Sequence, residues 1–411
     1  MQTHPIETVV LDDQACRIAA EVPGAHRPAA NAPYGPGGGT GLWSACTPDL
    51  APIMPNLFDP LVLRHGRVLS NRFVLAAMTN CQSHDDGTLS DDEFRWLTMR
   101  AQGGFAITTT CASHVQAIGQ GFPGQLGNFS ETQLPGLTRL AAAIRQAGSL
   151  AVTQLHHAGL RAPAKLIGTR PVGPSEDAET GARALSLAEV EQAAEDFIVA
   201  AERADRAGFD GIEVHGAHGY LLCQFLSAEA NRREDRYGGS LENRSRLLFD
   251  VVAGIRARCR RNFIVGVRLS PERFGLKVAE IQAVARRLMR ERAVDYVNLS
   301  LWDISKEPED EALRGRSLLS YFTELERGEV RVGAAGKIMS GADAAACLAA
   351  GADFAIIGRA AILHHDFPER VRADPGFRAI ATPVAERYLR AEGLGAAMIE
   401  YMRRWEGFVE A

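Results

Sequence analysis

From residue 73 onward, short apolar runs alternate with amphipathic stretches along most of the chain. The runs are rich in β-branched residues and apolar on both faces, which is typical of parallel strands buried on both sides. Eight runs predict strands: FVLAAM (73–78), FAITTT (105–110), LAVTQL (150–155), GIEVH (211–215), FIVGVRL (263–269), DYVNLS (295–300), VRVGAA (330–335) and FAIIG (354–358). Ahead of them, LFDPLVLRHGRVLSNRF (57–73) predicts two short β segments around a turn at His65-Gly66.

Helix signals lie between the predicted strands. Ser186 and Glu189 have the spacing of a capping box, as do Ser90 and Glu93, and the first pair opens a helix predicted to reach Arg206. Two more helix starts are predicted at Ser240 and Ser340, the second helix running to Ala350. Glycines that end helices just before a strand are Gly148, Gly208 and Gly351.

Eight strand–helix units predict an α/β fold, a (β/α)₈ TIM barrel spanning residues 53–375. A doubly wound sheet would need a glycine-rich turn after the first strand, and MTNCQSHDDG (78–87) does not provide one. The N-terminal hairpin is expected to close the bottom of the barrel. Residues 376–411 are expected to form a solvated helical tail, and contact of Arg403, Arg404 and Trp405 with a neighbouring subunit is the alternative.

Residues 1–52 differ in composition from the rest. The segment HRPAANAPYGPGGGTGLW (26–43) is rich in Gly, Pro, Ala and Asn, and such a segment cannot bury enough apolar surface to fold alone. Its glycine run lacks the GxGxxG spacing of a phosphate loop, contains Pro36 and follows no predicted strand. We therefore predict a leader that is flexible or draped over the barrel.

Composition excludes several classes of protein. The 411 residues contain 45 Lys and Arg against 50 Asp and Glu, a net charge of −5, so neither nucleic acid nor an anionic membrane is an expected partner. Seven cysteines without a CxxC argue against a disulfide scaffold, a zinc ribbon or a four-cysteine iron–sulfur site. No signal peptide and no long apolar stretch is evident, so a cytoplasmic protein is expected.

Chemistry in a barrel collects at the carboxyl ends of the strands. Those positions here form a polar ring: Thr79, Ala112, Gln154, His215 with His218, Arg268, Ser300, Gly336 and Gly358-Arg359. The last two strands end in small residues followed by Arg359, which is the usual phosphate seat of such barrels, although these glycines could also serve only as tight turns.

His215, His218 and Tyr220 lie within six residues at the end of the fourth strand. A metal site is disfavoured, because no third ligand is evident nearby, and two core histidines without function are the other alternative. Two imidazole donors can hold a carbonyl or nitro oxygen. A phenol remains protonated at neutral pH and can serve as a proton donor.

Several motifs in the right order resemble the old yellow enzyme family of FMN-dependent oxidoreductases over about residues 57–370. They are HGAHGYLLCQFLSAEANRREDRYGGSLENRSR (215–246), LHHAGLR (155–161), VGPS (172–175), VGVRLSP (265–271) and IIGRA (356–360). The resemblance implies an enzyme with bound FMN and NAD(P)H as reductant. The implied FMN-binding positions are Ala77, Met78, Thr79, Ala112, Gln154, Arg268, Ala335, Gly336, Gly358 and Arg359.

The resemblance also implies individual roles. The Thr79 hydroxyl contacts the flavin, Ala112 packs on its ring system, Gln154 pairs with its pyrimidine edge, and Arg268 lies near N1 and O2, where it favours the reduced state electrostatically. Gly336, Gly358 and Arg359 hold the phosphate. His215 and His218 hold the electron-withdrawing group of the substrate, and Tyr220 donates the proton.

The implied reaction reduces the C=C bond of an α,β-unsaturated carbonyl or nitro compound. NAD(P)H reduces FMN, flavin N5 delivers hydride to Cβ, and Tyr220 protonates Cα from the opposite face. Alternatives are an amine or N-methyl dehydrogenase or a desaturase of the same family, a non-redox phosphate-binding lyase or isomerase, and a silent flavin-binding protein. Small molecules are the expected partners, and a homo-oligomer is possible.

The chain departs from the family pattern in four places. Ala77 stands where many relatives have proline, and Cys111 where an acidic residue often precedes the alanine. Leu160 replaces an arginine that often follows HxG, although Arg161 comes next. The loop LSLWDISKEPE (299–309) is distinctive, and its Trp302, Asp303 and Lys306 either reshape the substrate pocket or form an ordinary surface loop.

Overall fold

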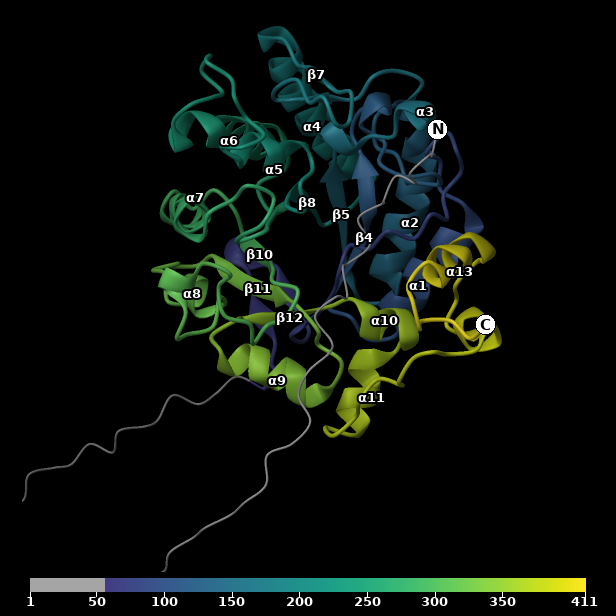
Figure 1. Cartoon of the computed structure of the whole chain (residues 1–411). Coiled ribbons are helices and arrows are strands. Elements are labelled where there is room, and N and C mark those ends of the chain that lie inside the picture. The colour runs from purple at the N-terminus through teal and green to yellow at the C-terminus, as the bar shows by residue number, and fades with distance from the viewer. Residues whose placement is uncertain (1–55) are drawn as a thin grey trace, which may run out of the picture. The chain divides into compact units, whose positions relative to one another are not determined.

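The computed structural model describes residues 56–411, and the predicted leader over residues 1–52 lies outside them. All eight predicted runs form strands, and these strands close into one parallel barrel, which confirms the predicted fold (Figure 1). In order around the barrel they are β3 (Phe73–Leu75), β4 (Ile107–His114), β5 (Leu150–His156), β8 (Gly211–Gly216), β9 (Ile264–Leu269), β10 (Tyr296–Ser300), β11 (Arg331–Ala335) and β12 (Phe354–Ile357).

Helices surround the strands (Figure 1). The longer ones are α1 (Asp91–Gln102), α2 (Leu134–Gln146), α4 (Leu187–Arg206), α6 (Leu241–Arg258), α7 (Val278–Arg290) and α9 (Gly341–Ala349). The shorter ones are α3 (Ala164–Ile167), α5 (Leu221–Leu226), α8 (Ser320–Thr323), α10 (Arg359–Leu363), α11 (Phe367–Ala373), α12 (Glu386–Ala391) and α13 (Ala396–Arg403). None of the helices in residues 56–411 has the length and apolarity needed to cross a membrane.

The predicted capping residues begin their helices. Ser186 accepts a hydrogen bond from the backbone N–H of Glu189 at 3.3 Å, and the Glu189 carboxylate accepts one from the Ser186 N–H at 2.8 Å, which completes a capping box. The serines at the starts of α1, α6 and α9 accept equivalent bonds. After the helices, Gly148, Gly208 and Gly351 have φ values of +86°, +88° and +93°, a conformation that favours glycine.

The N-terminal hairpin, β1 (Leu61–Val62) and β2 (Val68–Leu69), pairs antiparallel as predicted. Leu61, Leu63 and Leu69 are buried in a cluster with inward-facing side chains near the strand starts. Those side chains include Val74, Ile107, Val152, Ile264, Tyr296, Phe354 and Ile356. The hairpin therefore closes the amino-terminal end of the barrel with an apolar layer, and polar side chains are left to the opposite end.

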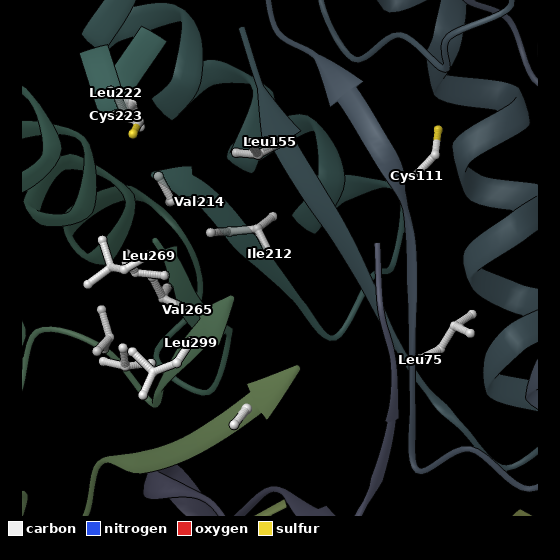
Figure 2. Close-up of a cluster of buried hydrophobic side chains, with 14 of the residues drawn as sticks. Leu75, Cys111, Leu155, Ile212, Val214, Leu222, Cys223, Val265, Leu269 and Leu299 are labelled. Atoms are coloured by element: carbon white, nitrogen blue, oxygen red, sulfur yellow. The ribbon is translucent and has the colours of Figure 1, made fainter. Parts of the chain in front are cut away.

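A second and larger apolar layer fills the space between strands and helices. Figure 2 shows part of it, with Ile212 and Val214 of β8, Leu155 of β5 and the helical Leu222 gathered around one region of this layer. Alternation along each strand thus assigns one set of side chains to the helices and the other to the barrel interior.

The C-terminal segment 376–411 packs against the barrel domain, so the prediction of a solvated tail was wrong. Met398, Ile399 and Met402 give α13 an apolar stripe and are at most 3% exposed. The backbone N–H of Gly395 donates to Gln82 Oε1 at 2.7 Å, which fixes α13 beside α1 (Figure 1). Hydrophobic spacing along this short helix carries the burial signal.

The capping box at Ser186 should contribute measurably to stability. Ser186→Ala removes an acceptor for the first turn of α4 and should lower the free energy of unfolding by about 1 kcal/mol. Urea unfolding at equal flavin content measures the difference. Leu187→Ala, at an adjacent position that is 42% exposed, is the matched control and should change stability far less. Equal losses in both variants would refute the capping contribution.

Candidate active site at the carboxyl ends of the strands

Parallel register brings the predicted site residues together. Ala112 of β4 pairs with Gln154 of β5, and His215 of β8 pairs with Arg268 of β9. Ser300 ends β10, where it pairs with Ala335 of β11. Residues that are far apart in the sequence therefore share one rim of the barrel.

One layer below that rim, the carboxylate of Glu213 links three strands. Gln154 Nε2 donates to Glu213 Oε1 at 2.7 Å, and Asn298 Nδ2 donates to Glu213 Oε2 at 2.9 Å. Sequence reasoning missed Glu213 and Asn298. A signal was available, because each lies two residues before a rim residue, His215 or Ser300, and so faces the same side of its strand.

His215 and His218 form a directed chain of hydrogen bonds. The N–H of Ala217 donates to His215 Nδ1 at 3.4 Å, so the proton of His215 is on Nε2, which lies 3.2 Å from His218 Nδ1. His218 Nε2 then donates to Ser300 Oγ at 2.6 Å. In this chain each imidazole uses its Nε2–H as a donor, His215 to His218 and His218 to Ser300.

Burial sets the charge of these two imidazoles. Burial lowers the pKa of both His215 and His218 well below the ordinary value of about 6.5. Positive charge on Arg268 and Arg161 lowers both pKa values further. A neighbouring histidine also lowers each pKa, His218 that of His215 and His156 that of His218. Both side chains are consequently neutral at neutral pH.

Tyr220 lies against this pair at the start of α5. Its ring centre lies 5.0 Å from that of His215 and 4.4 Å from that of His156, both in edge-to-face geometry. In the preceding turn His218 and Gly219 have φ values of +60° and +68°. This turn is sharp enough to bring the Tyr220 ring against the rings of His215 and His156. His156 was not predicted as a site residue, although it follows Gln154 by two on β5.

Arg268 is a buried cation with few partners. Its Nη1 donates to the Ala77 carbonyl and its Nη2 to Ser300 Oγ, both at 3.2 Å. Its Nε is buried and has no hydrogen-bond partner within residues 56–411. Burial lowers the Arg268 pKa, and the negative charge of Glu213 opposes that effect. An unpaired N–H on a buried cation needs an electron-rich partner.

Comparison with known proteins shows which family this chain belongs to. A sequence model of the family described as NADH:flavin oxidoreductase / NADH oxidase matches residues 56–375. The chain belongs to this family. It is an FMN-dependent oxidoreductase of the old yellow enzyme type, with NADH or NADPH as reductant, as the resemblance implied.

Similar proteins agree with this assignment. The chain is 35% identical over 327 residues to the "Probable NADH-dependent flavin oxidoreductase YqiG" of Bacillus subtilis, covering 77% of this chain and 87% of that protein. An old yellow enzyme homologue from Zymomonas mobilis superposes with a TM-score of 0.70 at 26% identity, covering 82% and 96%. Morphinone reductase in complex with tetrahydroNAD superposes with 0.69 at 28% identity, covering 84% and 96%.

The rim around Arg268 fits the flavin of this oxidoreductase. Its unpartnered Nε–H matches an electron-rich ring edge that gains negative charge on reduction. Because the Gln154 amide nitrogen is committed to Glu213, its amide oxygen is the group that could accept from a flavin N–H. Ala112 pairs with Gln154 and offers only a methyl group, which leaves room for a flat ring.

The segment that follows β3 carries the other predicted flavin contacts, Ala77, Met78 and Thr79, all half-buried. Burial raises the pKa of Tyr401 of α13, and the nearby side chains of Trp405 and Thr79 counteract that effect. The C-terminal helix thus lies near the predicted flavin contact Thr79, which no local sequence signal indicated.

The predicted phosphate seat has two glycines with different reasons to be glycine. At Gly358 a Cβ would meet only Met78 Sδ at 3.8 Å, so the backbone is open to a ligand, and Arg359 follows at the start of α10. At Gly336 a Cβ would lie 2.7 Å from the backbone nitrogen of Asp303. Close approach of the β10 loop, rather than of a phosphate, therefore requires glycine at residue 336.

The loop after β10 borders His218. Trp302, at a φ of +67°, lies with its ring centre 6.4 Å from that of His218, and Arg273 stacks on it at 5.0 Å. Lys306 is ion-paired with Glu272. Among residues 56–411 no cluster of three or more His, Cys, Asp or Glu side chains is arranged to hold a metal ion.

Buried neutral histidines make stability depend on pH. His215 and His218 have lowered pKa values in the folded protein, whereas the unfolded chain binds these protons near pH 6.5. The free energy of unfolding should therefore fall as the pH decreases below 6.5, by up to about 1.4 kcal/mol per pH unit for each histidine. Replacing both by Asn should reduce this slope in urea unfolding between about pH 5 and 7, and the slope that remains belongs to other buried histidines with lowered pKa values, such as His156 and His157.

His84→Asn is the control for that experiment, because His84 is exposed. This variant should retain the wild-type slope. If the double variant also retains it, the two imidazoles do not carry the pH dependence.

Proposed function

We propose that this oxidoreductase uses NADH or NADPH to reduce the activated C=C bond of α,β-unsaturated carbonyl or nitro compounds. The observation that carries the proposal is the cluster of Tyr220, His215 and His218 at the rim, in which two neutral imidazole donors lie beside a phenol. A pair of donors and a proton donor are the two groups that such a reduction requires from the protein.

FMN would be held by the flavin positions described above, with Arg268 and Gln154 at the ring and Arg359 at the phosphate. When bound, FMN supplies the redox chemistry: it accepts a hydride from the nicotinamide and passes it to the β-carbon of the substrate. The protein side chains then have to orient the alkene, polarise it and supply a proton.

His215 and His218 would hold the carbonyl or nitro oxygen of the substrate. Because both imidazoles are neutral, each can donate its Nε2–H without bringing a buried charge. In the free protein His215 donates to His218 and His218 donates to Ser300 Oγ, so binding would exchange these internal hydrogen bonds for ones to the substrate. Donation to the oxygen withdraws electron density from the β-carbon, and the hydrogen bonds strengthen as negative charge develops on the oxygen.

Tyr220 would protonate the α-carbon. Its ring is held between His156 and His215, with the guanidinium of Arg161 at 4.7 Å from the ring centre. Three neighbours restrict the phenol to a narrow range of orientations, which aligns its O–H with a substrate held by the histidines.

The experiment that tests this function separates the two half-reactions. The yellow, FMN-containing protein is reduced anaerobically with NADH or NADPH and then mixed with 2-cyclohexenone or a nitroalkene in a stopped-flow instrument. The expected result is rapid reoxidation of the flavin and formation of the saturated product. Reduction of the oxidised protein by an N-methyl amine, without reoxidation by any alkene, would instead support the dehydrogenase alternative.

Tyr220→Phe should separate proton donation from the rest of the reaction. Loss of a general acid slows the step it serves by about 10²- to 10⁴-fold, so reoxidation by 2-cyclohexenone should slow by that factor. Flavin reduction by NAD(P)H needs no proton donor and should remain near the wild-type rate. Tyr321→Phe, which removes a hydroxyl bonded to the Leu313 carbonyl, is the control. Equal slowing of both half-reactions by Tyr220→Phe would mean that Tyr220 is only structural.

A further inference from the structure

Arg161 lies beside the proposed proton donor and is not among the predicted FMN-binding positions. It ends the 3-10 turn η4 (Gly159–Arg161), which follows β5 at the rim. Its guanidinium carbon lies 4.7 Å from the ring centre of Tyr220, and its Nη1 donates to the backbone carbonyl of His218 at 2.5 Å. One hydrogen bond, to the His218 carbonyl, therefore holds the Arg161 side chain over the Tyr220 ring.

Three cations in the loops around this rim have carboxylate partners. Arg273 pairs with Glu309 at 2.6 Å, Lys337 pairs with Asp303 at 3.4 Å, and Lys306 pairs with Glu272 and Glu309. Arg161 differs, because no carboxylate of the described residues 56–411 lies within 4.0 Å of its nitrogens, and its one hydrogen bond goes to a neutral carbonyl. A half-buried cation without a counter-ion is poorly compensated, and an anionic ligand would compensate it.

In the proposed function two other rim cations, Arg268 and Arg359, would have the electron-rich ring edge and the phosphate of FMN as partners. Arg161 is not accounted for in this way, since it lies on the Tyr220 and His218 side, where the substrate binds. We infer that Arg161 binds a carboxylate of the substrate, and that the substrate class is an α,β-unsaturated carbonyl or nitro compound that also carries a carboxylate. The inference rests on the proposed function.

The chemistry of the side chain favours a carboxylate. A guanidinium presents its donors in a planar fork that matches two carboxylate oxygens, and contact of one face with the Tyr220 ring leaves the edge available for such a pair. Nε and Nη2 are the donors not committed to His218. A substrate carboxylate bound there would be separated by only a few covalent bonds from the substrate carbon that Tyr220 would protonate.

The phosphates of NAD(P)H are a second source of negative charge. They are separated from the nicotinamide by a ribose, so a cation that recognises them is expected farther from the reacting atoms than Arg161 lies. The substrate carboxylate is therefore the anion that the position favours, and the experiment below distinguishes the two.

A matched pair of substrates isolates the charge. The compounds 4-oxopent-2-enoate and its methyl ester contain the same enone and differ in the carboxylate. The measured quantity is the ratio of kcat/KM for the acid to kcat/KM for the ester. Because the ester also activates the alkene, the wild-type ratio is the reference, and Arg161→Gln should lower it by about 10- to 100-fold, the usual loss for one charge-assisted hydrogen-bonded pair. Arg161→Lys, which retains the charge but not the fork, should retain part of the preference.

A binding measurement gives a readout independent of turnover. The saturated acid 4-oxopentanoate cannot be reduced, and its binding to the oxidised protein can be followed through the flavin absorbance. Arg161→Gln should weaken it by a similar factor and leave the affinity of the methyl ester less affected. Arg273→Gln, at a cation that already has a carboxylate partner, is the control and should leave the acid-to-ester ratio unchanged.

Three results would overturn the inference. They are a wild-type protein that binds 4-oxopentanoate no better than its methyl ester, an Arg161→Gln variant that loses acid and ester activity equally, and weaker NADPH binding in that variant at an unchanged acid-to-ester ratio. The second result would make Arg161 a structural tether for His218, and the third would assign it to the coenzyme phosphates. Failure of both acid and ester to reoxidise the reduced flavin would instead contradict the proposed function, and the binding of 4-oxopentanoate would still decide the role of Arg161.

Discussion

The buried carboxylate of Glu213 is the interaction on which the rest of the candidate site depends. It accepts hydrogen bonds from Gln154 on β5, the strand before its own, and from Asn298 on β10, two strands after its own. These two bonds help to hold β5, β8 and β10 in register. It also supplies negative charge that helps keep the neighbouring Arg268 protonated. Without it, the Gln154 amide would be free to rotate and Arg268 would be a buried cation far from any anion.

Glu213 is negatively charged, whereas the charged side chains at the rim above it are positive. Arg268, Arg161 and Arg359 face the rim without carboxylate partners among residues 56–411, whereas the two histidines between them are held neutral by burial. A neutral donor pair flanked by uncompensated cations suits a ligand that develops negative charge during the reaction. The same arrangement would be costly in a protein that bound nothing there, because each half-buried cation loses hydration.

The sequence predicted the strands to within a few residues because buried parallel strands leave a strong apolar signal, and the capping serines marked helix starts for a similar local reason. Hydrogen bonds between residues far apart in the sequence could not be predicted. Gln154 and Glu213 are 59 positions apart, and no local pattern indicates which carboxylate meets which amide. The packing of α13 and the contact of Gly336 with Asp303 were missed for the same reason, since both depend on which segments the closed barrel brings together.

At Cys111, where many relatives have an acidic residue, a contact from another part of the fold supplies a carboxylate. Glu93, fully buried on α1, accepts a hydrogen bond from Asn80 Nδ2 at 3.1 Å and another from the Ser83 hydroxyl, and it lies within hydrogen-bonding reach of Cys111. A carboxylate is thus present beside Cys111 although β4 does not supply it. Burial raises the pKa of Glu93, and these hydrogen bonds oppose that effect. Because Glu93 occupies the position that would complete the capping box of Ser90, α1 has only half of that box, and the carboxylate instead fixes the segment that follows Thr79.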